Sequence, residues 1–164
     1  MTNTWHIHLS GLVQGVGFRP FVVSLAAKHQ IRGTVANGSD GVHVYFNATA
    51  QLAKTFYHEL LSQAPAESII THQQILPSSA AIFEDFSIVQ HHAGLSHNSM
   101  LITPDRAPCP SCLAEINDPS NRRYRYAFTT CLHCGPRYSI MKALPFEREH
   151  TRMDSFDMCP DCLH

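Results

Sequence analysis

The sequence lacks three features that would each have placed it in a broad class. It has no positive excess, because 12 Lys and Arg residues are balanced by 13 Asp and Glu residues. This charge balance gives no broad cationic field, so nucleic acid is not an expected partner. The first nine residues contain neither a basic cluster nor a long apolar run. This excludes a recognisable secretion signal or membrane span there, and predicts a cytoplasmic chain with no membrane partner.

The third missing feature is cysteine in the first two thirds of the chain. None occurs before residue 109, and all six lie in the last third. A reducing cytoplasm disfavours disulfides, which leaves metal binding or catalysis as the expected use of these thiols.

Residues 1–90 show alternating strand and helix signals. Trp5, Ile7 and Leu9 alternate with polar residues, as expected of a half-buried strand. The later signals are a helix with Pro20 as its first residue and an end near Gly33, a hairpin turning at 37–41, a second helix over 53–61, and strands over 69–75 and 83–89. The order predicts an α+β domain, a ferredoxin-like βαββαβ sandwich with one extra strand and with helices on one sheet face.

The C-terminal half has a different character. Periodicity disappears over residues 91–108, where polar residues, Gly94, Pro104 and Pro108 predict a linker. Residues 109–164 contain too few apolar side chains for a sizeable core, so another interaction must hold this region together.

A glycine-containing segment, Gly11 to Pro20, joins the first strand to the first helix. Glycines there let backbone N–H groups converge on an anion at a helix N-terminus, and the Arg19 fork can pair with two phosphate oxygens. The alternative is a tight turn with Arg19 in a surface ion pair. The segment matches neither the G-x-x-x-x-G-K-[ST] loop nor the dinucleotide-binding fingerprint.

Two motifs in this domain, Gly11-x-Val-Gln-Gly-Val-Gly-Phe-Arg19 and Gly33-x-Val-x-Asn37-x-x-Asp-Gly41, resemble the paired signature of acylphosphatases. The resemblance covers about the first ninety residues. It implies hydrolysis of acyl phosphates, with Arg19 binding the phosphate and Asn37 orienting the attacking water. Substrate binding would fall on the loop, namely on Gln14, Gly15, Val16, Gly17, Phe18 and Arg19. Positioning and charge stabilisation can suffice for this chemistry, so no metal is expected at the phosphate site.

Two C-x-x-C pairs, Cys109 with Cys112 and Cys131 with Cys134, are separated by eighteen residues. This is the spacing of a four-thiolate zinc site, in which the ion takes the place of a hydrophobic core. The sequence therefore predicts a structural Zn²⁺ in a small zinc-ribbon-like module.

A third pair, Cys159 and Cys162, is half of a second metal motif. Its completion could come from a further pair beyond residue 164, a second chain, His150 or His164, or interleaving with the earlier cysteines. The sequence does not choose among these alternatives.

The whole arrangement resembles the N-terminal part of the HypF family of hydrogenase maturation carbamoyltransferases. This resemblance implies carbamoyl phosphate as the substrate and a hydrogenase maturation protein with a C-terminal cysteine as the partner. The sequence ends inside the second zinc motif, and residues 91–164 contain no nucleotide-binding loop, so we expect hydrolysis without transfer from this chain alone. The alternative is a non-catalytic module that binds an anion and uses zinc to dock a protein.

Two further features of the sequence are not expected to take part in catalysis. The basic and aromatic segment 122–128 is expected to pack around the metal rather than to bind nucleic acid. The other histidines, among them His91 and His92, show no recognised ligand spacing and are expected on the surface.

Overall fold

The computed structural model describes residues 3–79, 81–90 and 100–163. Seven elements form the first region, to residue 90. They are β1 (Asn3–Leu12), α1 (Phe18–Lys28), β2 (Arg32–Gly38), β3 (Gly41–Ala48), α2 (Ala50–Ser62), β4 (Ile69–Pro77) and β5 (Phe86–Ile88). This is the expected element order, with β5 as the extra strand.

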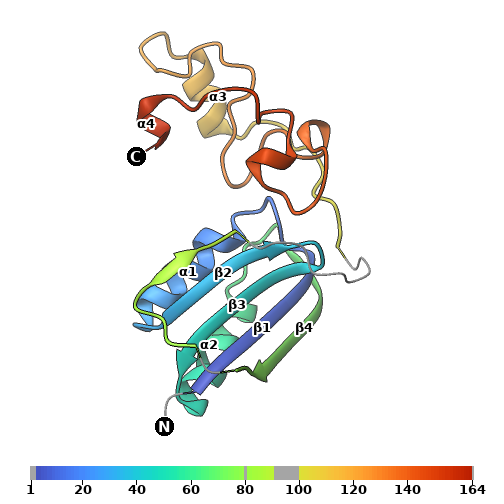
Figure 1. Ribbon diagram of the computed structural model, residues 1–164. Coiled ribbons are helices and arrows are strands. Elements are labelled where there is room, and N and C mark those ends of the chain that lie inside the picture. Colours follow the sequence, from blue (N-terminus) through green and yellow to red (C-terminus); the bar gives the residue numbers. More distant parts are fainter. Residues whose placement is uncertain (1–2, 80, 91–99, 164) are drawn as a thin grey trace.

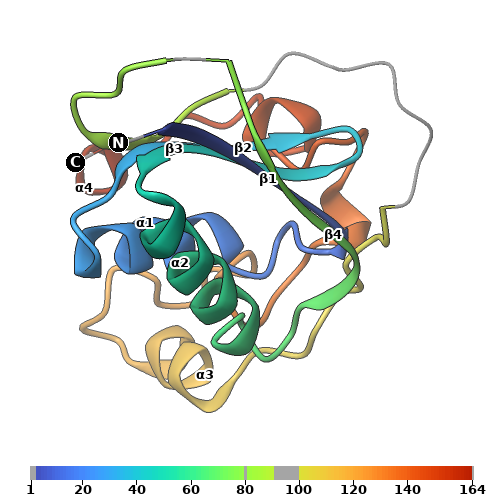
Figure 2. The same ribbon diagram turned by 90° about the horizontal axis from the view of Figure 1, so that it is seen from below.

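The strands form one five-stranded sheet in the order β4-β1-β3-β2-β5. The neighbours are antiparallel except β2 and β5, which run parallel at one edge. Helices α1 and α2 lie on the same face of this sheet (Figures 1 and 2). The α+β sandwich predicted from periodicity is therefore confirmed.

The core lies between the sheet and its two helices. Ile7 and Leu9 of β1 are fully buried, as their alternation predicted, and Phe56 of α2 is buried against them. Helix α1 begins at Phe18 rather than at Pro20, because Gly17 turns the chain earlier and the Phe18 side chain enters the core. Pro20 is thus the third helical residue, where its missing N–H still costs no intrahelical bond.

The second region, residues 100–163, has only short elements: α3 (Pro110–Asn117), the 3₁₀ turns η1 (Tyr138–Ile140) and η2 (Arg148–His150), and α4 (Pro160–Leu163). It lies at the end of the sheet where the β1–α1 loop and the β2–β3 turn meet (Figure 1).

The first half of the expected linker, 91–99, lies outside the described residues. The following residues bind the first region: the Leu101 N–H donates to Gly11 O at 3.1 Å, and Thr103 Oγ1 donates to Gln14 O at 2.5 Å. The second region is therefore attached directly to the glycine-containing loop. The exact domain boundaries remain a prediction.

The longest helix in the described part of the chain, α2, has 13 residues. A membrane-crossing helix needs about 20 apolar residues, and none of the described helices meets that requirement.

Candidate functional site

The loop between β1 and α1 is shaped by two glycines. Gly15 and Gly17 have φ values of 72° and 76°, in the left-handed region that residues with a Cβ rarely adopt. Gly17 is the N-cap of α1 and has no side chain with which to cap it. The first N–H groups of the helix are therefore available to an anion at the positive end of the helix dipole.

Arg19 and Asn37 come from different elements and meet at this loop. Arg19 lies in the first turn of α1, and Asn37 lies next to last in β2. Both line one cavity of about 990 Å³. Four other predicted loop residues line the same cavity: Gln14, Gly15, Gly17 and Phe18. The two residues named for catalysis are thus brought together by the fold.

Three of the predicted binding residues have side chains that are not free for a ligand. Val16 is absent from the cavity wall and Phe18 is 2% exposed, because both side chains belong to the core. Gln14 is also buried, and its amide donates to Gly38 O at 2.8 Å and to Gly41 O at 3.0 Å. Any contact of these residues with substrate would have to use the backbone, while the Gln14 side chain fixes the β2–β3 turn.

Asn37 is 2% exposed and its two amide atoms differ in their bonding. Nδ2 donates to Phe146 O at 3.3 Å. Oδ1 is buried and has no hydrogen-bond partner within the described ranges. A buried acceptor without a partner is costly. It is also the atom that can accept a hydrogen bond from an attacking water.

Arg19 has a partner that sequence reasoning missed. Its Nη1 donates to Glu147 Oε1 at 2.5 Å, and the two side chains are 22% and 18% exposed. The neighbouring Phe146 N–H donates to Gln14 Oε1 at 2.7 Å. The segment 146–147 therefore covers the loop with a carboxylate at the predicted phosphate-binding guanidinium. A separation of 128 residues left no local sequence signal for this pair.

Arg137 is a second residue to which the sequence gave no role, although it follows Cys134 closely in the Cys-Gly-Pro-Arg run. Its Nε donates to Gly15 O at 2.6 Å, and its Nη atoms donate to Thr130 Oγ1 and to the Cys131 carbonyl at 2.7 and 2.5 Å. Burial lowers the pKa of this guanidinium. Arg137 thus ties the second cysteine pair to the glycine loop.

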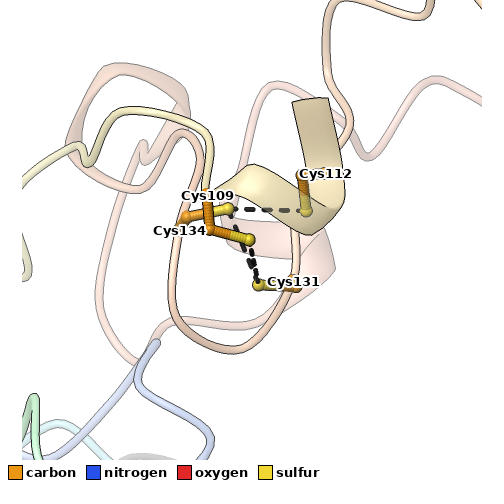
Figure 3. A group of neighbouring side chains, drawn as sticks. All are labelled: Cys109, Cys112, Cys131 and Cys134. Atoms are coloured by element: carbon orange, nitrogen blue, oxygen red, sulfur yellow. Dashed lines mark hydrogen bonds between the residues drawn. The ribbon is translucent and has the colours of Figure 1, made fainter. Parts of the chain in front are cut away.

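The predicted metal ligands converge on one point. The Sγ atoms of Cys109 and Cys131 are 3.9 Å apart, those of Cys131 and Cys134 are 3.6 Å apart, and those of Cys134 and Cys112 are 3.5 Å apart (Figure 3). A tetrahedral ion with Zn–S bonds of about 2.3 Å requires sulfurs about 3.8 Å apart. A disulfide would need about 2.05 Å. The four thiols therefore fit a zinc ion.

The environment of the sulfurs agrees with a cation. Burial raises the pKa of the Cys112 thiol to about 12. At Cys134 burial acts in the same direction, but hydrogen bonds from the backbone and from the neighbouring thiols outweigh it and lower the pKa to about 6. Cys134 therefore loses its proton more readily than Cys112, and an ion must displace the proton from Cys112 when it binds.

Cys159 does not join this cluster. It is exposed, and its Sγ accepts from Arg122 Nη1 at 3.3 Å. The four earlier cysteines form a complete group without it, so the interleaved arrangement is not the one observed. The assignment of Cys159 and Cys162 to a second metal site remains a prediction.

The aromatic rings of segment 122–128 are exposed rather than packed around the cysteine cluster as expected. Tyr124 and Tyr126 are 40% and 48% exposed. The two preceding arginines instead pair with carboxylates, Arg122 with Asp161 and Arg123 with Glu115. The rings are exposed because this stretch is a succession of turns rather than a regular element.

Comparison with known proteins assigns both regions. The acylphosphatase family profile matches residues 5–88, and the profile of the HypF finger matches residues 109–141. Acylphosphatase of Staphylococcus haemolyticus is 35% identical, over 50% of this chain and 90% of the relative. The chain therefore belongs to the acylphosphatase family, with a HypF finger after the acylphosphatase domain.

The similarity extends over both regions together. Carbamoyltransferase HypF of Rhodobacter capsulatus is 42% identical, over 98% of this chain and 21% of the relative. A crystal structure of full-length HypF in the phosphate- and nucleotide-bound form superposes with a TM-score of 0.87 at 36% identity, over 99% of this chain and 21% of that one. The chain corresponds to the N-terminal region of the HypF carbamoyltransferases and spans about a fifth of their length.

Proposed function

We propose that this chain hydrolyses acyl phosphates at the loop between β1 and α1, and that carbamoyl phosphate is its substrate. The observation that carries the proposal is the meeting of Arg19 and Asn37 in one cavity at an uncapped helix N-terminus. The membership in the acylphosphatase family supports the reaction class, and the similarity to carbamoyltransferases supports the carbamoyl group.

The phosphoryl group would be held by charge and by backbone donors. Arg19 uses Nη1 for Glu147, and a guanidinium has five N–H donors, so it can still offer others to phosphoryl oxygens. The N–H groups of the loop and of the first turn of α1 would donate to the same anion. These donors would stabilise the charge on the equatorial oxygens as the bond to the acyl oxygen lengthens.

The attacking water would be positioned by Asn37, whose Oδ1 is the unpaired acceptor at the cavity. The water oxygen forms a bond to phosphorus, and the bond between phosphorus and the acyl oxygen breaks with its electron pair on that oxygen. Carbamoyl phosphate dianion and water give carbamate and dihydrogen phosphate, so both water protons end on the phosphate. The carbamate is a good leaving group, and no covalent intermediate is required.

The zinc module has a structural part in this proposal. Zn²⁺ held by Cys109, Cys112, Cys131 and Cys134 would supply folding free energy to the second region. That region places Phe146 and Glu147 over the loop. Transfer of the carbamoyl group to a hydrogenase maturation partner with a C-terminal cysteine would belong to a longer protein, and this chain would supply the hydrolytic step.

Phosphate release from carbamoyl phosphate by the zinc-loaded chain tests the proposal. Arg19→Ala should lower kcat/KM by about 10²-fold or more, because it removes a charge-assisted donor to the transition state. Arg32→Ala is the matched control, since Arg32 is exposed on β2 outside the cavity and its loss changes the net charge equally. Equal activity in the Arg19 and Arg32 variants would refute the assignment.

Asn37→Ala separates water positioning from binding. It should lower kcat more than it changes KM, because the amide acts on the attacking water. Acetyl phosphate as a second substrate distinguishes acyl phosphates in general from carbamoyl phosphate: a higher kcat/KM for the carbamoyl compound is expected.

One observation favours a second function. Arg19 is already paired with Glu147, and Asn37 with Phe146, as expected of a site covered by its own zinc module. A non-catalytic module that binds an anion and docks a protein would have these contacts too. Inorganic phosphate binding without any phosphate release from acyl phosphates would select this alternative.

A further inference from the structure

Helices α1 and α2 cover one face of the sheet (Figure 2). The opposite face carries a group of stacked histidines. Side chains alternate along strands, so the inward Ile7 and Val42 place His6, His8 and His43 on the opposite face. The His8 and His43 rings are 4.5 Å apart, with their planes 9° from parallel. His43 is 8% exposed and therefore buried, contrary to the surface position expected from the sequence.

Asp40 lies between two of these imidazoles. One carboxylate oxygen, Oδ1, is 2.8 Å from His43 Nε2, and the other, Oδ2, is 3.5 Å from His8 Nε2. One ligand atom from each of the three residues lies within 4.8 Å of the others. Tetrahedral zinc with bonds of about 2.1 Å requires ligand atoms about 3.4 Å apart. The two measured separations bracket that value.

The fold, rather than chance side-chain rotation, brings these groups together. His8 and His43 are directly opposite one another in the β1–β3 register. Asp40 is held in the two-residue turn between Gly38 and Gly41, which pair with each other. The backbone positions of the three residues are therefore fixed before an ion binds, and the stacked imidazoles need only rotate to aim their in-plane lone pairs at it.

His43 also has the outer contact that is typical of a metal-binding histidine. Its Nδ1 is 3.0 Å from His6 Nε2, which leaves Nε2 turned toward Asp40. Metal-binding histidines usually donate from the other ring nitrogen to an acceptor that fixes the ring. The side chains of His8, Asp40 and His43 are 19%, 18% and 10% exposed, so an ion can enter from solvent.

We propose that His8, Asp40 and His43 form a binding site for a divalent transition-metal ion such as Zn²⁺, separate from the cysteine cluster. Two imidazoles and one carboxylate are a donor set that zinc accepts, with water in the fourth position. These residues do not line the cavity of Arg19 and Asn37, so the site is also separate from the phosphate loop. The bound ion would fix the turn that follows Asn37 and Gly38.

Zinc titration of the full chain against a chromophoric zinc chelator tests the proposal. The chain should bind one equivalent tightly at the cysteines and a second equivalent more weakly. His8→Gln and Asp40→Asn should each weaken the second equivalent by about 10-fold or more while retaining the first, because each removes a direct ligand. His58→Gln is the matched control, since His58 is exposed on α2 and is not a member of the group. A single equivalent in the wild-type chain would overturn the proposal.

Two further measurements separate this site from other metal binding. The second equivalent should persist in Cys159→Ser, and its loss there would assign it to the third cysteine pair and overturn the proposal. In imidazole ¹H–¹⁵N spectra, the second equivalent should shift the His8 and His43 resonances but not those of His58, which lies on α2. Uniform shifts across all histidines would show non-specific binding and would also contradict the proposal.

Discussion

The two regions of this chain have folded by different means. In the described part of residues 3–90, eighteen buried apolar side chains form one continuous core between the sheet and its helices. Among residues 100–161 the buried non-polar side chains are Cys112, Cys134 and Pro145. The other buried groups there are mostly polar, among them Thr103, Thr129 and Arg137. The first region can be held by burial of hydrocarbon, whereas the second depends on what its cysteines bind.

The two regions also depend on each other at the glycine-containing loop between β1 and α1. Gly15 O accepts a hydrogen bond from Arg137, and Gln14 accepts hydrogen bonds from Thr103 and Phe146. The glycine loop is thus completed by the region with the weaker core. Loosening the zinc module should therefore change the phosphate site without unfolding the sheet.

Removal of zinc should have the largest effect of the changes considered, because it should disorder the second region while the first stays folded. Structural zinc contributes about 10 kcal/mol or more of folding free energy in small zinc domains. Chelation, or Cys112→Ser, should therefore abolish the ordered backbone signals of residues 100–163 in a ¹H–¹⁵N spectrum while those of the sheet remain. Cys159→Ser is the control, because Cys159 is exposed and outside the cluster. An unchanged second region after loss of zinc would mean that another interaction holds it.

Removing the charge of Glu147, which pairs with Arg19 where the two regions meet, should have a smaller effect. Glu147→Gln should tighten inorganic phosphate binding by about threefold to fivefold, because the carboxylate repels the anion and occupies one Arg19 donor, and a partly exposed ion pair is worth up to about 1 kcal/mol. Calorimetric titration of phosphate into the full chain measures this. Glu149→Gln changes the net charge equally at an exposed position away from Arg19 and should have little effect. Weaker phosphate binding in the Glu147 variant would show that the carboxylate positions Arg19 rather than competing for it.

Much of the fold and of the cysteine site could be predicted from the sequence, because both depend on local spacing. The alternation around Ile7 and the three- and four-residue spacing around Phe56 specify which faces are buried. The two C-x-x-C pairs specify the four sulfurs that converge. Arg19 and Asn37 were assigned to the site through the resemblance of their motifs to the acylphosphatase signature, and their catalytic roles remain a prediction.

The remaining parts of the site depend on tertiary docking, which no local pattern records. Glu147 reaches Arg19 only because the second region packs on the glycine loop. Arg137 followed a recognised cysteine pair, but its partner Gly15 is 122 residues away. The grouping of His8 with His43 follows from the register of β1 with β3, which becomes visible only when the strands are paired.

The smallest expected effect concerns a link within the first region, where charge adds little to a hydrocarbon core. Lys28 at the end of α1 donates to Glu59 of α2 at 2.6 Å. The hydrogen bond from Lys28 and then the contact with His29, whose Nε2 is 3.3 Å from the carboxylate, lower the pKa of Glu59 to about 2, from an ordinary value of 4.5. When folding lowers the pKa of a carboxyl group, the charged carboxylate stabilises the folded protein at pH values above the pKa of the unfolded state. This stabilisation is lost as the pH falls through the pKa of the folded state. The part of the stability difference between the wild type and Glu59→Gln that depends on the carboxylate should therefore shrink between pH 4.5 and 2. Urea unfolding followed by the fluorescence of Trp5, the single tryptophan, reports on the first region even where acid releases zinc from the second.

Glu84→Gln, at an exposed position, serves as the charge-matched control. A Glu59 difference that did not change across this range would show that the link between the helices contributes through packing rather than through charge.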